Sequence, residues 1–112
     1  NALVVPWSAY GTRIFVNPPY RRETICQFLR CAMRAGGKVS VVALIPVRTD
    51  TGAWTDYVWP CAAEIRCLNG RLRFVGAKAS APFPSAVVVW RPGVNEQQVF
   101  QWDWKKNEKV TR

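Results

Sequence analysis

The chain has 112 residues, of which 49% are apolar, and its 16 Lys and Arg against 7 Asp and Glu give a net charge of +9. This length suits one domain with one hydrophobic core and is short for two. The composition excludes a disordered tail, and no apolar run is long enough to cross a membrane. The positive charge favours a polyanionic partner such as nucleic acid, although a solvated basic surface explains it equally well.

The first predicted element is a strand over residues 12–16 (TRIFV), which runs into the sequence Asn17-Pro18-Pro19-Tyr20. Two consecutive prolines cannot donate backbone hydrogen bonds, so the strand must end there. The residue before a proline is also pushed toward extended geometry. Asn17 and Tyr20 are therefore presented on a stiff loop, which is either a plain strand terminator or a rigid site.

An amphipathic helix is predicted next, because apolar residues recur at helical spacing. They are Ile25, Phe28, Leu29, Ala32 and Met33. Gly36-Gly37 supplies the stop signal at the end of this helix. Residues 38–45 (KVSVVALI) then predict a strand buried on both faces of a parallel sheet. A strand, a helix and a buried strand in this order make a βαβ unit.

A polar loop after Pro46 is followed by a brief helical period that Pro60 cuts short. Trp54, Trp59 and Trp90 are expected in the core. Further on, the apolar runs at residues 63–68 and 72–75 flank an Asn-Gly pair. Such a pair between strand-like runs is the strongest short signal for a β-hairpin.

The last predicted strand covers residues 86–90 (AVVVW), and residues 98–104 alternate only weakly between apolar and polar. We expect the lysine-rich residues 105–112 to fray. The whole chain is therefore predicted to be a single α/β domain with a mostly parallel sheet and one antiparallel hairpin. Ligands of such sheets bind outside the carboxyl ends of the strands. FVNPPY and the loop after Pro46 both occupy that edge.

The cysteines offer no sign of a metal site. None of the four forms a CxxC pair, and the chain contains no histidine. A structural metal is therefore not expected. With no signal peptide visible, we expect reduced, mostly buried thiols in a cytoplasmic protein. These cysteines are Cys26, Cys31, Cys61 and Cys67.

The loop at Asn17 suits the binding of a flat, amide-like nitrogen. Exocyclic amines of bases are poor nucleophiles, because the lone pair of the nitrogen is delocalised into the ring. The side-chain oxygen of Asn17 and the carbonyl of Pro18 can accept both N–H hydrogens and favour a more localised lone pair during methyl transfer. Pro18 and Pro19 hold these acceptors in place, and Tyr20 offers a face for stacking. This chemistry needs no general base before attack, which agrees with the absence of histidine.

Several segments resemble one family in their order along the chain. The tetrapeptide NPPY is similar to the target-amine motif of the amino methyltransferases. Together with PVRTDTGAWTDYV, AEIRCLNGRLRFVG and APFPSAVVVW, it resembles the phage-type, Dam-like DNA adenine-N6 methyltransferases. The resemblance covers about residues 7–91, and the order of several motifs is much more specific than NPPY alone.

This resemblance implies a Rossmann-like domain that uses S-adenosylmethionine, flips an adenine out of double-stranded DNA and methylates its N6 amine. Asn17, Pro18, Pro19 and Tyr20 are then the catalytic residues, in the cytoplasm of a bacterial or phage-infected cell. In such enzymes the cofactor-binding strand and turn precede NPPY, but residues 1–11 contain no glycine-rich turn and no acidic residue. We therefore expect the cofactor-binding residues upstream of Asn1, on a segment or second chain that completes the sheet.

Other residues have two interpretations. Arg48, Thr49 and Asp50 are expected in the wall of the DNA-binding cleft, but Asp50 could equally cap the next helix. Arg71 and Arg73 could contact phosphates or serve as edge charges that discourage sheet pairing. An NPPY loop also serves enzymes that methylate a glutamine amide, although the basic charge favours DNA. A further alternative is a catalytically incomplete nucleic-acid-binding remnant or subunit.

Overall fold

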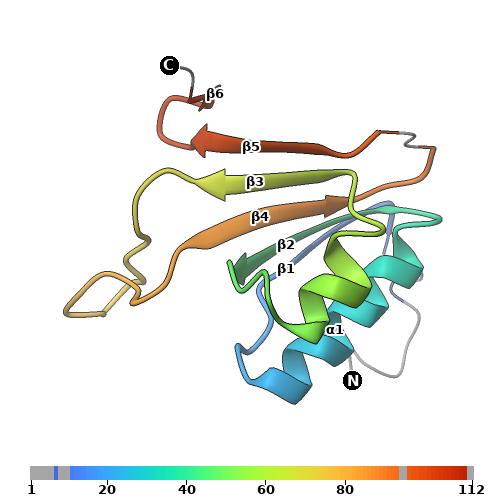
Figure 1. Cartoon of the computed structure of the whole chain (residues 1–112), viewed down its shortest axis with the longest axis horizontal. Coiled ribbons are helices and arrows are strands. Elements are labelled where there is room, and N and C mark those ends of the chain that lie inside the picture. The colour runs from blue at the N-terminus through green and yellow to red at the C-terminus, as the bar shows by residue number, and fades with distance from the viewer. Residues whose placement is uncertain (1–6, 8–10, 94–95, 111–112) are drawn as a thin grey trace.

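The computed structural model describes Trp7, residues 11–93 and residues 96–110. Within these residues one mixed sheet carries a helix, α1 (Arg22–Ala35), and a short π-helical segment, η2 (Trp54–Val58), on the same face (Figure 1). The sheet has the spatial order β1-β2-β4-β3-β5-β6. Its strands are β1 (Arg13–Val16), β2 (Ser40–Pro46), β3 (Glu64–Leu68), β4 (Ser85–Trp90), β5 (Gln98–Asp103) and β6 (Glu108–Lys109).

The strand directions place several loops at one edge of the sheet. β1 is parallel to β2, and β3 is parallel to β5. β4 is antiparallel to both β2 and β3, so it lies between two strands that run the same way. β1, β2, β3 and β5 therefore end at the same edge, on the left in Figure 1, which we name the carboxyl edge. β6 runs opposite to β5 and begins at this edge.

The α/β class is confirmed, but the mostly parallel Rossmann arrangement is not, because three of the five pairings among the described strands are antiparallel. The predicted hairpin is wrong, since residues 72–75 form no strand and β3 pairs with β4 and β5 instead. The physical reason is burial. Pairing β3 with β4 leaves Ile65, Ala86 and Val88 fully buried. Val75, in the segment that was predicted to pair with β3, is fully exposed instead.

The predicted helix is confirmed as α1, with Leu29 and Ala32 fully buried against the sheet. Its C-terminus uses glycine for a different reason than expected. Gly36 has a right-handed φ of −61°. A Cβ atom at Gly36 would lie 2.4 Å from the Cβ atom of Trp90, so only glycine allows the end of the helix to come this close to β4.

The two faces of β2 differ, although burial on both was predicted. Val41, Ala43 and Ile45 are fully buried beneath the helical layer. Leu44 on the opposite face is only half-buried, and Phe15 of β1, which pairs with Val42 of β2, is 68% exposed. The difference arises because both described helical segments cover the same face of the sheet (Figure 1).

The C-terminal residues that the structure describes form a strand that was not predicted. Residues 105–112 were predicted to fray, but Glu108–Lys109 form β6 against β5, and the backbone N–H of Val110 donates to the carbonyl of Gln101 at 2.9 Å. These backbone hydrogen bonds hold the segment in place as far as Val110. Residues 111–112 lie outside the described residues.

Two of the three tryptophans expected in the core are there, since Trp54 and Trp90 are almost fully buried. Trp59 is 40% exposed, because it follows η2 and packs on the Trp54 ring from outside, with ring centroids 5.3 Å apart. The expectation of mostly buried thiols also needs correction, because Cys61 is exposed and the other three cysteines are half-buried. None of the described helices is long and apolar enough to span a membrane.

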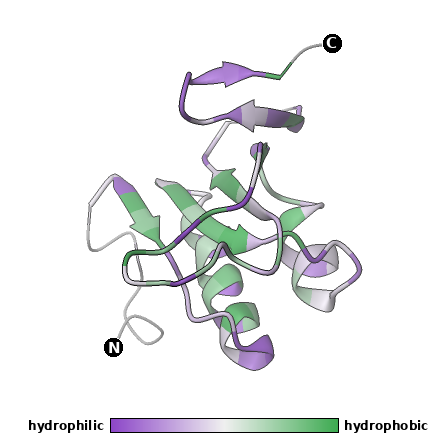
Figure 2. Ribbon diagram, turned by 90° about the vertical axis from the view of Figure 1, so that its left-hand side faces the viewer, coloured by the Kyte–Doolittle hydropathy of each residue, from purple (hydrophilic) through white to green (hydrophobic). Residues whose placement is uncertain are grey.

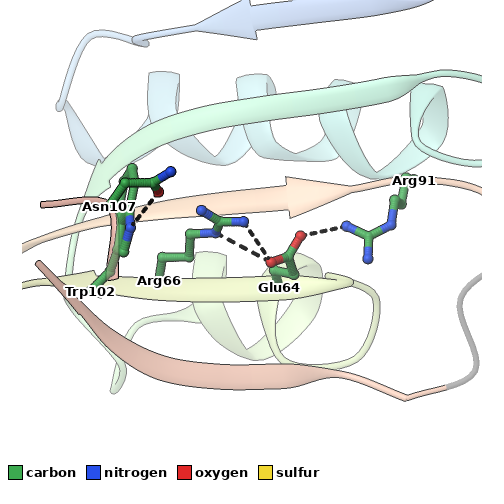
Figure 3. Close-up of polar contacts among 5 residues, drawn as sticks. All are labelled: Glu64, Arg66, Arg91, Trp102 and Asn107. Carbon is green, nitrogen blue, oxygen red and sulfur yellow. Dashed lines mark hydrogen bonds and ion pairs between the residues drawn. The ribbon is translucent and has the colours of Figure 1, made fainter. Parts of the chain in front are cut away.

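A network of ion pairs links β3 to the residue that follows β4. One carboxylate oxygen of Glu64 accepts from Nε and Nη2 of Arg66 at 3.2 and 2.9 Å, and the other accepts from Nη1 of Arg91 at 2.5 Å (Figure 3). Burial alone would raise the pKa of Glu64. The hydrogen bonds from Arg91 and Arg66, together with their charges, outweigh burial and lower the pKa below the ordinary value of 4.5.

Because the pKa of Glu64 is lowered by folding, its ion pairs contribute stability that is fully present above about pH 4.5 and is lost as the pH falls through the folded value. We expect Glu64→Gln to lower the free energy of unfolding by about 1 to 2 kcal/mol at pH 7. This loss of unfolding free energy should be smaller below pH 4.5. Urea denaturation of the parent and the variant at pH 7 and at a pH below 4.5 measures the difference. Exposed Glu96→Gln is the control. A cost for Glu64→Gln that does not change with pH would contradict this explanation.

Candidate active site

Three loops meet at the carboxyl edge. The parallel register of β1 and β2 places Val16 opposite Ala43, so the loop that begins at Asn17 emerges beside Leu44. β4 runs the other way, with Ser85 opposite Pro46, so the segment before β4 reaches the same edge. The backbone N–H of Val47 donates to the carbonyl of Pro84 at 2.8 Å and fastens two of these loops together. The structure thereby brings NPPY, PVRT and APFPS side by side.

The NPPY loop presents the side chain of Asn17 to solvent. Asn17 and Pro19 are exposed, whereas Pro18 is buried and anchors the loop. The hydroxyl oxygen of Tyr20 lies 2.6 Å from Oδ1 of Asn17 and 3.1 Å from the backbone oxygen of Leu44. Its single hydrogen can be donated to one of these oxygens at a time. Burial raises the pKa of Tyr20 above its ordinary value of 10.0, so the phenol stays a donor at neutral pH.

The contact with Tyr20 fixes the orientation of the Asn17 amide. An amide oxygen has two lone pairs, so accepting from Tyr20 leaves one lone pair for a further N–H donor. The side chain of Asn17 is exposed, so such a donor can reach it from solvent. Tyr20 is therefore a positioning residue for Asn17, in addition to the stacking function predicted from the sequence.

Phe83 is a site residue that the sequence analysis missed. The ring of Tyr20 meets the ring of Phe83 edge-on, with centroids 5.6 Å apart and an interplanar angle of 78°. The guanidinium carbon of Arg48 lies 5.4 Å from the centroid of the same ring. Phe83 thus joins the NPPY loop to the loop after β2. Its position between Pro82 and Pro84, just before a buried strand, was a signal of the same kind as NPPY.

Thr49 and Asp50 lie in an exposed turn of the loop after β2. The alternative that Asp50 caps the next helix is wrong for η2, because its N-cap residue is Ala53 and no side chain makes the cap hydrogen bond. The hydroxyl of Thr51 donates to the carbonyl of Arg48 at 2.7 Å and stabilises this loop from within. Arg48 is the residue of this loop that the structure connects to the NPPY loop, through Phe83.

Arg71 and Arg73 lie on the loop between β3 and β4 and not on a hairpin. Nε and Nη2 of Arg73 donate to the carbonyls of Ala77 and Lys78 at 3.1 and 3.2 Å, so this side chain closes its own loop. Arg71 is exposed. Both remain predicted phosphate contacts at the carboxyl edge, where the loop after β3 begins.

A pocket of about 410 Å³ lies beside this site, between the first turns of α1 and the loop after β2. Its volume is in the range of small-molecule sites. The indole N–H of Trp54 donates to the carbonyl of Pro46 at 3.2 Å and supports one wall. The lining residues are Arg22, Ile25, Cys26, Pro46, Arg48, Thr51, Gly52, Ala53 and Trp54.

Among the described residues that line this pocket, Arg22 and Arg48 are the charged ones, and both are basic. The other lining residues carry no charge, and most of them are apolar. The pocket therefore has a mainly apolar wall with positive charge on two of its elements. Where the cofactor-binding residues lie stays a prediction.

Comparison with known proteins identifies the family of the chain and a solved structure of similar fold. The sequence profile described as DNA N-6-adenine-methyltransferase (Dam) matches residues 1–111. No curated protein matches the chain. Among solved structures, the type IIL restriction-modification enzyme MmeI in complex with DNA is similar in fold, with a TM-score of 0.62 at 10% sequence identity. The match covers 98% of this chain but 20% of that enzyme. With nearly its whole length matched by the family profile, the chain belongs to the DNA N-6-adenine-methyltransferase (Dam) family.

Proposed function

We propose that this chain carries the target-amine site of an enzyme that methylates the N6 amine of a flipped adenine in double-stranded DNA. S-adenosylmethionine is the proposed methyl donor. The observation that carries this proposal is the exposed Asn17 side chain, whose Oδ1 atom lies 2.6 Å from the Tyr20 hydroxyl on a loop fixed by two prolines. Membership of the Dam family and the net charge of +9 support DNA as the substrate.

The proposed chemistry depends on acceptors that are in place before the base arrives. Oδ1 of Asn17 and the carbonyl of Pro18 accept the two N–H hydrogens of the adenine amine. These hydrogen bonds strengthen as positive charge develops on the nitrogen during methyl transfer, so they stabilise the transition state more than the ground state. Since Pro18 is buried and Tyr20 restrains Asn17, neither acceptor has to reorganise at that moment.

The residues around the loop are proposed to hold the DNA. Tyr20 and Phe83 provide adjoining aromatic rings beside the acceptors, which suits stacking of a base. The guanidinium group of Arg48 lies over the Phe83 ring and adds a positive charge beside these two aromatic rings. Thr49 and Asp50 are proposed to form the exposed wall on the same loop.

We expect replacement of both Arg71 and Arg73 with Gln to make DNA binding less sensitive to salt. Each lost phosphate contact should reduce the slope of log affinity against log salt concentration by about 0.9. The measurement is a salt titration of binding to a duplex by fluorescence anisotropy. Arg30→Gln, on the exposed side of α1, is the control. A slope identical to that of the parent protein would show that the two arginines are edge charges.

The proposed function is tested by incubating the intact protein with DNA and S-adenosylmethionine labelled on its methyl group. Digestion of the DNA to nucleosides should place the label on N6-methyladenine. A parallel reaction offers a glutamine-containing peptide, which a glutamine-amide methyltransferase would label instead. DNA binding with no transfer to either substrate would identify a catalytically incomplete subunit and overturn the proposal.

A further inference from the structure

The turn between β5 and β6 is built rigidly by its own side chains. Oδ1 of Asp103 lies within hydrogen-bonding distance of the backbone N–H groups of Lys105 and Lys106, at 3.2 and 3.3 Å. The indole N–H of Trp102 donates to Oδ1 of Asn107 at 3.2 Å (Figure 3). Asn107 has a left-handed φ of 55°, which Asn tolerates better than most residues. The backbone that carries the two lysines is therefore preorganised.

The charges of this turn are available to a partner. Within the described residues both ion pairs use Glu64, so neither Lys105 nor Lys106 takes part in one. Both lysines are exposed, and Nζ of Lys105 lies 5.6 Å from the ring centroid of Trp104, which is 40% exposed. Figure 2 shows the strands next to the C-terminus mainly in hydrophilic colours, against the hydrophobic central strands. One cation over an exposed indole, with a second cation on the next residue, suits a polyanion that carries flat bases.

The turn lies at the same edge of the sheet as the NPPY loop. β5 runs in the same direction as β1, so both loops follow strand ends at the carboxyl edge (Figure 1). On the face away from α1, a hollow of about 240 Å³ is lined by Phe15, two residues before Asn17, and by Trp102 and Trp104. Four strand spacings separate β1 from β5 in the sheet order. At roughly 4.8 Å each, the two loops are about 19 Å apart.

We propose that the β5–β6 turn is a second DNA contact, in which Lys105 and Lys106 bind backbone phosphates on one side of the target base. This inference rests on the proposed function, because it takes the NPPY loop as the position of the flipped adenine. A duplex advances about 3.4 Å per base pair, so 19 Å corresponds to about six base pairs. The turn therefore contacts phosphates within about six base pairs of the adenine.

The double variant Lys105→Gln/Lys106→Gln tests this contact in the intact protein. The probe is a duplex of 30 base pairs with one mismatched adenine at its centre, since a mismatched base is flipped most easily and fixes the position of the protein. Hydroxyl-radical footprinting should show protection about five or six base pairs from the adenine in the parent protein and none there in the variant. The salt slope of binding should also fall by about 1.8, for two lost phosphate contacts.

Arg34→Gln/Lys38→Gln is the matched control, because it removes the same charge at the opposite edge of the sheet, where α1 ends and β2 begins. This control variant should keep both the protection about five or six base pairs from the adenine and the salt slope of binding of the parent protein. Protection that persists in the Lys105/Lys106 variant, with an unchanged slope, would overturn the inference while leaving the proposed function intact. A parent protein that binds this duplex nowhere would overturn both. Thermal unfolding of both variants at the parent temperature shows that the fold is unchanged.

Discussion

Asn17→Ala is expected to lower the single-turnover rate of methyl transfer by about 100-fold or more, as when an aligned transition-state acceptor is removed. Its side chain is exposed, so the substitution removes no buried contact and should leave the free energy of unfolding nearly unchanged. The rate should be measured with DNA and cofactor both saturating, so that weaker binding does not hide the effect on the chemical step.

Two further variants separate the acceptor from its support. Asn17→Asp keeps an acceptor oxygen and should retain more activity than Asn17→Ala. Tyr20→Phe keeps the aromatic ring but removes the hydroxyl that lies 2.6 Å from Oδ1 of Asn17, so it should reduce the rate by less than tenfold. If Asn17→Ala stays within a few fold of the parent, Asn17 does not belong to the reacting site.

The local elements of the fold could be predicted from the sequence. The apolar residues of α1 recur at helical spacing, and β1, β2 and β4 stand out as short apolar runs. Both signals depend only on neighbouring residues. The NPPY loop could be predicted for the same reason, because two prolines restrict the backbone wherever they stand.

The pairing of the strands could not be predicted in this way. Asn69-Gly70 is a correct turn signal, since Gly70 has a φ of +86°, but the signal does not say which segment returns to β3. That choice depends on the apolar area buried between β3 and β4, whose paired residues Ile65 and Val88 lie 23 positions apart in the chain. β5 was not predicted as a strand, because half of its residues are exposed to solvent. Exposed positions weaken the apolar pattern that indicates a strand.

The candidate site also combines a contact that the sequence could predict with one that depends on strand pairing. Asn17 and Tyr20 are neighbours in sequence, and their contact follows from the loop itself. Phe83 joins the site only because β4 runs antiparallel to β2, which brings the segment before β4 to the carboxyl edge. A site residue whose position depends on strand direction cannot be predicted until the order and directions of the strands are known.

The second large effect is expected at Trp54, which is 2% exposed and supports the wall of the pocket beside the NPPY loop. Trp54→Ala should lower the free energy of unfolding by about 3 to 5 kcal/mol, because it removes a large buried side chain and leaves a cavity. A domain of this size is stable by only about 5 to 15 kcal/mol, so the variant should be partly unfolded at mild urea concentrations.

Two control variants identify the source of this cost. Trp54→Phe keeps most of the buried ring but loses the N–H group that donates to the carbonyl of Pro46 at 3.2 Å, so it should cost less than Trp54→Ala. Trp59→Ala removes a neighbouring tryptophan that is 40% exposed, and its cost should be the smallest of the three. Urea denaturation followed by far-UV circular dichroism measures all of them, because that signal does not depend on tryptophan fluorescence. If Trp54→Ala lies within about 1 kcal/mol of the parent, the loop after β2 is held by contacts other than this indole, and the pocket wall does not depend on Trp54.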